Sequence, residues 1–381
     1  MKIASISSII LASAYLLNAA GNWPNYRGPS KDGTVNPTSK LPTEWGEDKN
    51  VKWKTEIHGR AWSSPVIWGD QIWLTTASKD GKKLTGMCVD KNSGKLIYDQ
   101  LLFTIKEPQY AHKFNSYASP SPVLESGRAY LHWGSPGTAC IDTKTFKTLW
   151  TRPDFVCDHF RGSGSSPFIY NDLLVLTMDG ADVQYLVALD KDTGKTIWRT
   201  DRSTDFKDLD ANGNPKRDGD ERKCYSTPII VNVDGRDLLI SPGAKAAWAY
   251  EPLTGKPVWQ FRYKNHSSAS RPVFNNGLLY INSGYSVAEL FAVKPSGTGD
   301  ITDKNKVWGV SGSNIPKKPS PILHEGLLYL CSDSGIATCL DAATGKEIWK
   351  ARLGGNYSAA LIRHKNHIYA FSEDGRGVVF T

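Results

Sequence analysis

Beyond its first twenty residues, this 381-residue chain contains no apolar run long enough to cross a membrane. It also lacks runs of basic residues, because its lysines and arginines are scattered among aspartates despite a formal net charge of +8. No nucleic-acid recognition motif accompanies that charge, so nucleic acid is not an expected partner. A diffuse basic surface mildly favours other anionic partners. With 40% hydrophobic and 22% charged residues, the chain has the composition of a globular protein with a large core.

The first twenty residues have the composition of an export signal. Lys2 supplies a positive charge, an apolar stretch occupies residues 3–17, and small residues near Ala20 offer a cleavage site. A membrane anchor is the alternative, and the short apolar stretch argues against it. No cysteine follows this stretch, which removes the usual site of bacterial lipid attachment. We therefore expect a signal peptide at 1–20 and a periplasmic or secreted protein without a membrane span.

The six cysteines are expected to be free thiols, although an exported protein could form disulfides. Cys88, Cys140 and Cys339 occupy the same position of a repeated motif, where other copies have alanine. This pattern indicates small buried residues, and their places in different copies are too far apart for bonding. Cys157 and Cys224, each just ahead of an expected strand, are the one pair left open.

A repeated eleven-residue motif, most copies of which end in tryptophan, dominates what the sequence does contain. It reads CLDAATGKEIW at 339–349, ALDKDTGKTIW at 188–198 and AYEPLTGKPVW at 249–259. Each copy follows a Ser-Pro type turn and two short apolar runs, as in SSPVIWGDQIWLTTA from Ser63. The unit recurs about every 40 to 60 residues, the range of four-stranded propeller blades. Each unit therefore predicts four strands, with the closing tryptophan packed against the neighbouring sheet.

The copy ALDKDTGKTIW resembles the tryptophan-docking repeat of quinoprotein-type β-propellers, a family that includes pyrroloquinoline quinone (PQQ) dehydrogenases and BamB-like proteins. The segments WPNYRG, LPTEW, DHFRGSGSSP, DVQYLVALD and GGNYSA resemble the soluble BamB-like branch. The resemblance implies an all-β, quinoprotein-like propeller of eight four-stranded blades, of which six and part of a seventh are present. We expect an N-terminal extension at 21–50 and the propeller at 51–381, with its C-terminal blades missing. Residues 51–54 would supply the outer strand of the last blade.

In a propeller of this kind, the loops between blades and the middle hairpin of each blade emerge on one face, around the channel. The side chains expected there are polar and mostly basic, which suits an anionic ligand or a loop of a protein partner. The candidate ligand-binding residues are His112, Asn115, His159, Arg161, Asp179, Asp182, Lys245, His266, Arg271, Lys317 and Asn356. Each could instead cap a turn or face water. The three histidines could also bind a metal, but they come from separate blades at no diagnostic spacing.

An insertion between Trp198 and Cys224 contains the start of a calcium loop. In DLDANG from residue 208, oxygen-bearing side chains alternate and a glycine stands at the sixth position. The candidate calcium ligands are Asp208, Asp210, Asn212, Asp218 and Asp220. Gly219 stands at the twelfth position, where a bidentate glutamate is expected, and flanking helices are not apparent. A solvated, turn-rich excursion is the alternative.

The expected function is that of a non-catalytic binding scaffold. The resembling dehydrogenases use calcium, a catalytic aspartate and, in many members, two adjacent cysteines, and this sequence has no adjacent cysteines. We therefore expect a monomeric scaffold that binds a protein partner or an anionic ligand, with no cofactor and with PQQ disfavoured. Two alternatives stay open. One is a PQQ-dependent or carbohydrate-active enzyme with its site in the propeller funnel, and the other is a purely structural module.

Overall fold

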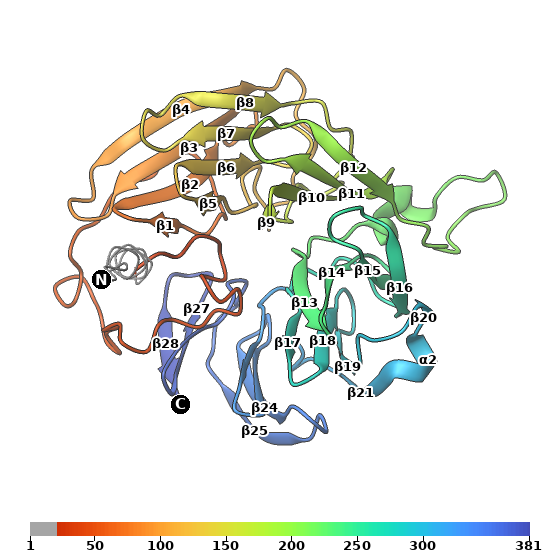
Figure 1. The fold of residues 1–381 in the computed structure, drawn as a ribbon. Helices are drawn as coiled ribbons and strands as arrows, with labels where there is room; N and C mark the ends of the chain where they lie inside the picture. Colours follow the sequence, from red (N-terminus) through yellow and green to blue (C-terminus); the bar gives the residue numbers. More distant parts are fainter. Residues whose placement is uncertain (1–20) are drawn as a thin grey trace, which may run out of the picture.

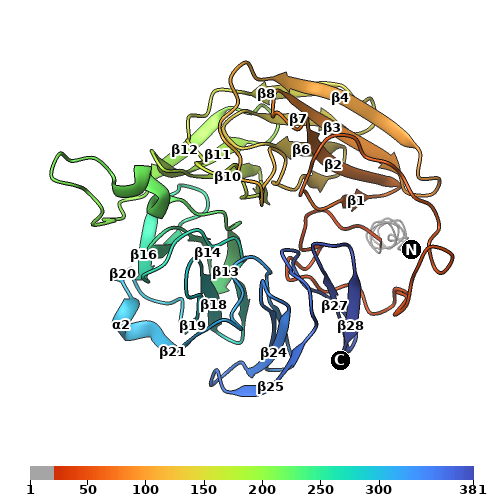
Figure 2. The same cartoon turned by 180° about the vertical axis from the view of Figure 1, so that it is seen from behind.

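The computed structural model describes residues 21–381, so the signal peptide predicted at 1–20 lies outside the described residues. Residues 21–381 form seven antiparallel sheets arranged in a ring, with the first strand of each sheet innermost (Figures 1 and 2). This confirms the all-β, quinoprotein-like propeller. The eight blades implied by the resemblance stay a prediction. No helix between residues 21 and 381 is long and apolar enough to span a bilayer.

We number the sheets one to seven along the chain, and the first three have four strands each. The first sheet consists of β1 (Val66–Trp68), β2 (Gln71–Ala77), β3 (Lys83–Asp90) and β4 (Leu96–Thr104). The second consists of β5 (Val123–Glu125), β6 (Arg128–His132), β7 (Thr138–Asp142) and β8 (Thr148–Arg152). The third consists of β9 (Phe168–Tyr170), β10 (Leu173–Asp179), β11 (Gln184–Asp190) and β12 (Thr196–Asp201). The 3-10 helix η1 (Lys216–Arg222) follows within the insertion.

The remaining sheets vary this plan only at their edges. The fourth consists of β13 (Ile229–Val233), β14 (Arg236–Pro242), β15 (Ala246–Tyr250), β16 (Pro257–Arg262) and the added parallel strand β20 (Gly299–Asp300). The fifth consists of β17 (Val273–Asn275), β18 (Leu278–Ser283), β19 (Glu289–Val293) and β21 (Lys306–Ser311), with the short helix α2 (Thr302–Asn305) before β21. The sixth consists of β22 (Ile322–His324), β23 (Leu327–Cys331), β24 (Ile336–Asp341) and β25 (Glu347–Arg352). The seventh has three strands, β26 (Ile362–His364), β27 (His367–Phe371) and β28 (Gly377–Phe380).

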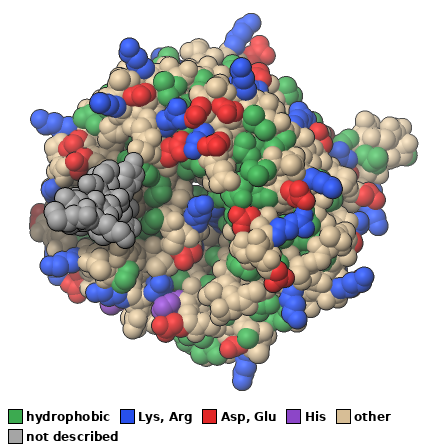
Figure 3. Space-filling view, in the orientation of Figure 1, with side chains coloured by type: hydrophobic (Ala, Val, Ile, Leu, Met, Phe, Trp, Pro, Cys, Tyr) green, Lys and Arg blue, Asp and Glu red, His purple; other side chains and the backbone are tan. Residues whose placement is uncertain are grey.

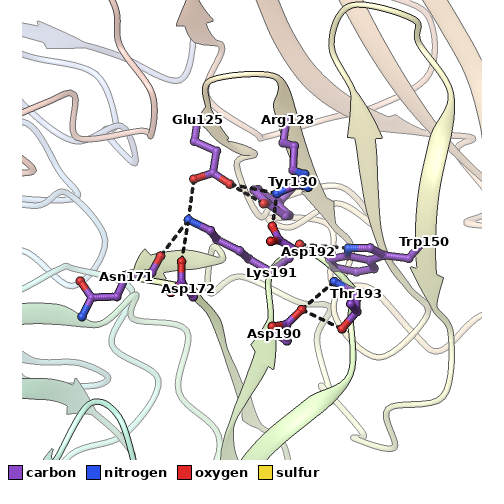
Figure 4. Close-up of polar contacts among 10 residues, drawn as sticks. All are labelled: Glu125, Arg128, Tyr130, Trp150, Asn171, Asp172, Asp190, Lys191, Asp192 and Thr193. Atoms are coloured by element: carbon purple, nitrogen blue, oxygen red, sulfur yellow. Dashed lines mark hydrogen bonds and ion pairs between the residues drawn. The ribbon is translucent and has the colours of Figure 1, made fainter.

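The closing tryptophans of the second to fifth sheets each dock on the next sheet. Trp150 of β8 donates its indole N–H to the backbone oxygen of Lys191, at 3.0 Å, in the β11–β12 turn of the third sheet (Figure 4). Gly194 of this turn lies so close to the indole that a methyl group there would come within 2.7 Å of the ring. The same indole-to-carbonyl bond joins Trp198 to Pro252, Trp259 to Pro295 and Trp308 to Ala342. The core therefore lies between adjacent sheets, and the repeated motif builds it, as predicted.

A small residue faces each docking aromatic residue across the β-ladder. Cys339 lies directly opposite Trp349, and a β-bulge follows it. Ala188 and Trp198 show the same pairing and the same bulge in the third sheet. The position is fully buried in both sheets, which explains why only alanine or cysteine occupies it. All six cysteines are buried and unpaired, as expected.

The Ser-Pro signature forms a second band of contacts between sheets. The backbone N–H of Ser64 donates to the Ser121 hydroxyl at 2.8 Å, and that of Ser121 donates to Ser166 at 3.0 Å. Ser166 N–H in turn donates to the Thr227 hydroxyl at 2.9 Å. Each hydroxyl before a proline therefore satisfies a buried amide of the preceding sheet.

The segment Val51–Lys54 forms no strand, contrary to the expectation that it completes the last blade. Trp53 nevertheless docks on the first sheet as the other tryptophans dock on theirs. Its indole N–H donates to the backbone oxygen of Lys91 at 2.9 Å, and Gly94 lies against the ring.

Candidate functional site

We call the side of the ring predicted to hold the site the loop face. It consists of the loops that precede each inner strand, together with the middle hairpin of each sheet. Backbone hydrogen bonds join neighbouring loops: Trp62 N–H to Ala118 O at 3.1 Å, Tyr225 N–H to Ser268 O at 2.9 Å, and Ala269 N–H to Lys317 O at 3.0 Å. Because these bonds tie neighbouring loops together, the side chains of the joined loops are held in fixed relative positions.

Several predicted residues meet in a chain of charges on the loop face. Arg161 Nε lies 3.5 Å from a carboxylate oxygen of Asp220, which also pairs with the buried ammonium of Lys223. Next to them, Lys245 donates to Glu221 at 2.7 Å. The insertion therefore contributes to this face through η1, whose carboxylates neutralise lysines and arginines of other loops. We call these five residues the charged arc.

His266 and Lys317 continue the arc toward the sixth sheet. The His266 side chain is buried, and its pKa is lowered to about 4, chiefly by burial and further by Lys223 and Lys245. It is therefore neutral at pH 7. Its ring lies 5.9 Å from that of Tyr285, over which the Lys317 ammonium sits at 5.4 Å.

An exposed aromatic patch extends the loop face over the first two sheets. Trp62, Tyr110 and Phe114 are 53%, 64% and 70% exposed. The Arg60 guanidinium covers the Trp62 ring at 5.1 Å and donates to the backbone oxygen of Lys113 at 2.5 Å. The Lys113 ammonium lies over the Phe114 ring. We call these five residues the aromatic patch.

The predicted residue His112 connects the aromatic patch to the charged arc. Its ring contacts that of Phe114 at 5.1 Å, and its backbone N–H donates to Arg161 O at 3.2 Å. Burial, followed by Arg161 and Lys113, lowers its pKa below the ordinary histidine value. Five of the eleven candidate ligand-binding residues, namely His112, Arg161, Lys245, His266 and Lys317, thus lie in or beside the charged arc and the aromatic patch.

Other candidates hold the fold instead of facing a ligand. Asp179 is fully buried in a two-bond ion pair with Arg202, at 2.7 and 2.9 Å. Asp182 accepts backbone N–H bonds from Asp158 and Val183. The Asn115 amide donates to the backbone oxygens of Arg161 and Ser163, and Asn356 O accepts a bond from Glu373 N–H.

His159 and Arg271 are also enclosed. His159 Nε2 accepts the backbone N–H of Ser135 at 2.9 Å, which leaves the proton on Nδ1, 3.6 Å from Cys157 Sγ. Burial lowers the pKa of His159 to about 4 and raises that of the Cys157 thiol well above its ordinary value. Arg271 lies inside the ring and donates to the backbone oxygen of Pro228. His112, His159 and His266 are therefore not three ligands of one site.

The five calcium candidates do not converge. Asp208 is buried in a two-bond pair with Arg222, at 2.7 and 2.9 Å, and Asp210 accepts the backbone amides of Asn212 and Asn214. Asn212 and Asp218 are exposed, while Asp220 belongs to the charged arc. The first part of the insertion projects outward from the ring, away from its centre (Figures 1 and 2).

Three of the candidate carboxylates, Asp179, Asp208 and Asp220, are engaged by cations of the protein. Between residues 21 and 381, no group of three or more histidine, cysteine or acidic side chains is arranged to hold a metal ion. These residues do not fit a calcium site.

Sequence reasoning missed the aromatic patch. The patch had a visible signal, the aromatic and basic residues of YAHKF at 110–114. Aromatic residues are common in cores, however, and only the structure shows that these are exposed.

The docked sheets and the loop face define a quinoprotein-type β-propeller. A family model described as outer membrane protein assembly factor BamB matches residues 53–223, 182–300 and 248–381. The chain therefore belongs to the BamB family.

Solved structures agree with this fold. BamB from Moraxella catarrhalis is similar with a TM-score of 0.58 and 18% identity, over 82% of this chain and 81% of that one. The quinohemoprotein alcohol dehydrogenase from Comamonas testosteroni is similar with a TM-score of 0.50 and 12% identity, over 94% of this chain and 77% of that one. At these identities the likeness shows the fold alone. No curated protein sequence matches this chain.

Proposed function

We propose that this propeller is a non-catalytic envelope scaffold whose loop face holds a protein partner. The observation that carries the proposal is the aromatic patch, in which three exposed aromatic rings stand side by side with Arg60 and Lys113. Aromatic residues and arginine are enriched in the energetically dominant parts of protein interfaces. Family membership favours a partner in outer-membrane protein assembly and a periplasmic location.

The geometry of the loop face supports a binding function without catalysis. The loops are tied together by backbone bonds, so little conformational freedom is lost when a partner docks. Two carboxylates of this face, Asp179 and Asp220, are paired with cations of the protein, which disfavours either of them as a catalytic base. We therefore propose that the protein works without calcium or quinone.

A site-specific photocrosslinker tests the proposed interface. Placed at Phe114 in the native host, it should give one discrete adduct with an envelope protein, and Trp62→Ala should reduce that adduct. Leu253 is the matched control position. It is 57% exposed, but it lies in the β15–β16 turn, at the opposite end of the strands from the loop face. Adducts of equal yield from both positions, or none from Phe114, would contradict the proposal.

The enzyme alternative has its own test. PQQ is titrated into the purified protein with and without calcium, with tryptophan fluorescence as the readout. We expect no saturable quenching. Saturable quenching that requires calcium would replace the scaffold proposal with a quinoprotein enzyme.

A further inference from the structure

The centre of the ring is occupied by residues 22–36, which we call the central segment. It contacts the inner strands of most sheets. Trp23 bridges Ile67 of β1, Pro24 O accepts Leu124 N–H of β5, and Thr34 bridges Arg363 of β26. The segment thus runs along the inner side of the ring, from the first sheet to the seventh (Figure 1).

Two fully buried arginines meet at this segment without a carboxylate partner. Arg27, 1% exposed, donates to the backbone oxygens of Leu361 and Pro321 at 2.7 and 2.6 Å. Arg271, 2% exposed, donates to Pro228 O and to Lys31 O. The carbonyl oxygens satisfy N–H groups but carry no net charge. Arg27 Nε is buried without any hydrogen-bond partner.

Arg202 shows how the same protein treats a buried guanidinium elsewhere. It is equally buried but forms a two-bond pair with Asp179. The contrast is reflected in the pKa values: Asp179 and its neighbours hold the pKa of Arg202 above the ordinary value, whereas burial lowers the pKa of Arg27 to about 10 and also lowers that of Arg271. Arg27 and Arg271 therefore lack the carboxylate partner that neutralises Arg202.

Lys31 adds a third positive charge, and this one is open to solvent. Its side chain is exposed, and its ammonium lies 4.9 Å from the centroid of the Phe168 ring on β9. Two carboxylates, Asp32 and Asp237, lie near these cations, but neither forms an ion pair with Lys31, Arg27 or Arg271. Asp32 accepts bonds from Ser30 and from Thr34 N–H, and Asp237 accepts the hydroxyl of Tyr170. One face of the molecule shows a hollow in the middle of the ring with basic side chains beside it (Figure 3).

We propose that the centre of the propeller binds a small oxyanion of the phosphate, sulfate or carboxylate class. The Lys31 ammonium is the direct ligand, because it is exposed and has donors to spare. Arg27 and Arg271 lie behind it and supply buried positive charge that water screens poorly. An anion there relieves the cost of burying unpaired charges, which is large without such compensation. This site is independent of any partner on the loop face.

Ligand-dependent stability of the isolated protein tests the site. The thermal midpoint is measured at constant ionic strength with chloride replaced stepwise by phosphate, sulfate or acetate. An oxyanion that binds the folded state raises the midpoint in proportion to the logarithm of its concentration above Kd. We expect this rise for the unmodified protein, and we expect Lys31→Met to weaken the apparent affinity about tenfold or more, as for loss of one charge-assisted hydrogen bond.

Lys144→Met is the matched control, because Lys144 is an exposed lysine in the β7–β8 turn. It should bind oxyanion as the unmodified protein does. The order of phosphate, sulfate and acetate identifies the preferred group. Equal midpoints in chloride and in all three oxyanions, or an unchanged response in Lys31→Met, would overturn the proposal.

Discussion

At the scale of single residues, this protein is organised by where its charges are buried and what each one meets. Asp179 ends β10 and Arg202 follows β12, and their pair is sealed by Ser241 of the fourth sheet. The ion pair lies within the third sheet, and the bond from Arg202 to the Ser241 hydroxyl connects it to the fourth. Neither side chain is accessible to solvent, so either one alone would be an uncompensated charge.

Asp179→Asn should lower the free energy of unfolding by about 3 to 5 kcal/mol, because it leaves Arg202 buried and unpaired. Urea denaturation followed by tryptophan fluorescence measures the change. Asp182→Asn in the same hairpin is the control. Its exposed oxygen accepts backbone bonds that asparagine can also accept, so the effect should stay within about 0.5 kcal/mol. Similar losses in both variants would mean that the buried pair has no special role.

The position of Asp179 could be predicted from sequence, but its role could not. Its place after an apolar strand correctly located it in a middle hairpin. Whether its side chain faced solvent depended on Arg202, which is 23 residues further along the chain. The same limit applies to His159, whose ring position is set by the Ser135 amide from another sheet.

At the scale of elements, the stability of the ring is concentrated where one sheet's tryptophan meets the next sheet's turn. Trp198 packs on the β15–β16 turn and donates to Pro252 O, while Thr200 donates to Gly255 O at 2.8 Å. Gly255 has a φ of +70°, and a methyl group there would lie 2.4 Å from the indole. The glycine of the repeated TGK sequence is therefore required twice, for its backbone angle and for the close approach of the ring.

Gly255→Ala should destabilise the protein by clearly more than Gly235→Ala. Both glycines have positive φ, but Gly235 in the β13–β14 turn has no atom within 4 Å of the added methyl group. The control should therefore cost only the backbone term of about 1 kcal/mol, whereas Gly255→Ala adds overpacking of about 1 to 3 kcal/mol. Chemical denaturation of both variants measures the difference. If the two losses are equal, the indole does not press on the turn as described.

Strands and docking tryptophans were predictable because they repeat, and each copy strengthens the others. The serine hydroxyl band was not, although its residues were part of the repeated signature. The sequence showed that Ser121 and Ser166 recur before proline, but the bonds run between sheets and depend on how closely these pack.

At the scale of the whole molecule, the ring is held together by contacts distant in sequence. Arg27 donates to Leu361 and Pro321, so the start of the described chain is bonded to the sixth and seventh sheets. The sequence predicted residues 21–50 as an extension of the propeller. The repeat could not predict their position, because residues 22–36 do not match the repeated unit. Individual backbone carbonyl groups of other sheets hold them in place.

Three buried histidines should make global stability depend on pH. Burial lowers the pKa of His132 to about 3 and those of His159 and His266 to about 4, against about 6.5 in an unfolded chain. Between these values the unfolded state binds more protons than the folded state, so stability falls as pH decreases below about 6.5. The slope is about 1.4 kcal/mol per pH unit for each histidine.

Urea midpoints at several values between pH 7.5 and 5 measure this dependence. His266→Gln should reduce the slope by about one proton, because it removes one of the three buried rings. A flat profile over this range would mean that the three histidines bind protons equally well in the folded and the unfolded state. That result would contradict the lowered pKa values.

The central segment links the two ends of the ring. Trp23 is bonded to Ile67 of the first sheet, while Arg27 donates to the carbonyls of Leu361 and Pro321 beside the seventh and sixth sheets. Residues 22–36 therefore act as a strap between the first sheet and the last ones, and loosening this strap would loosen the ring at the place where its ends meet.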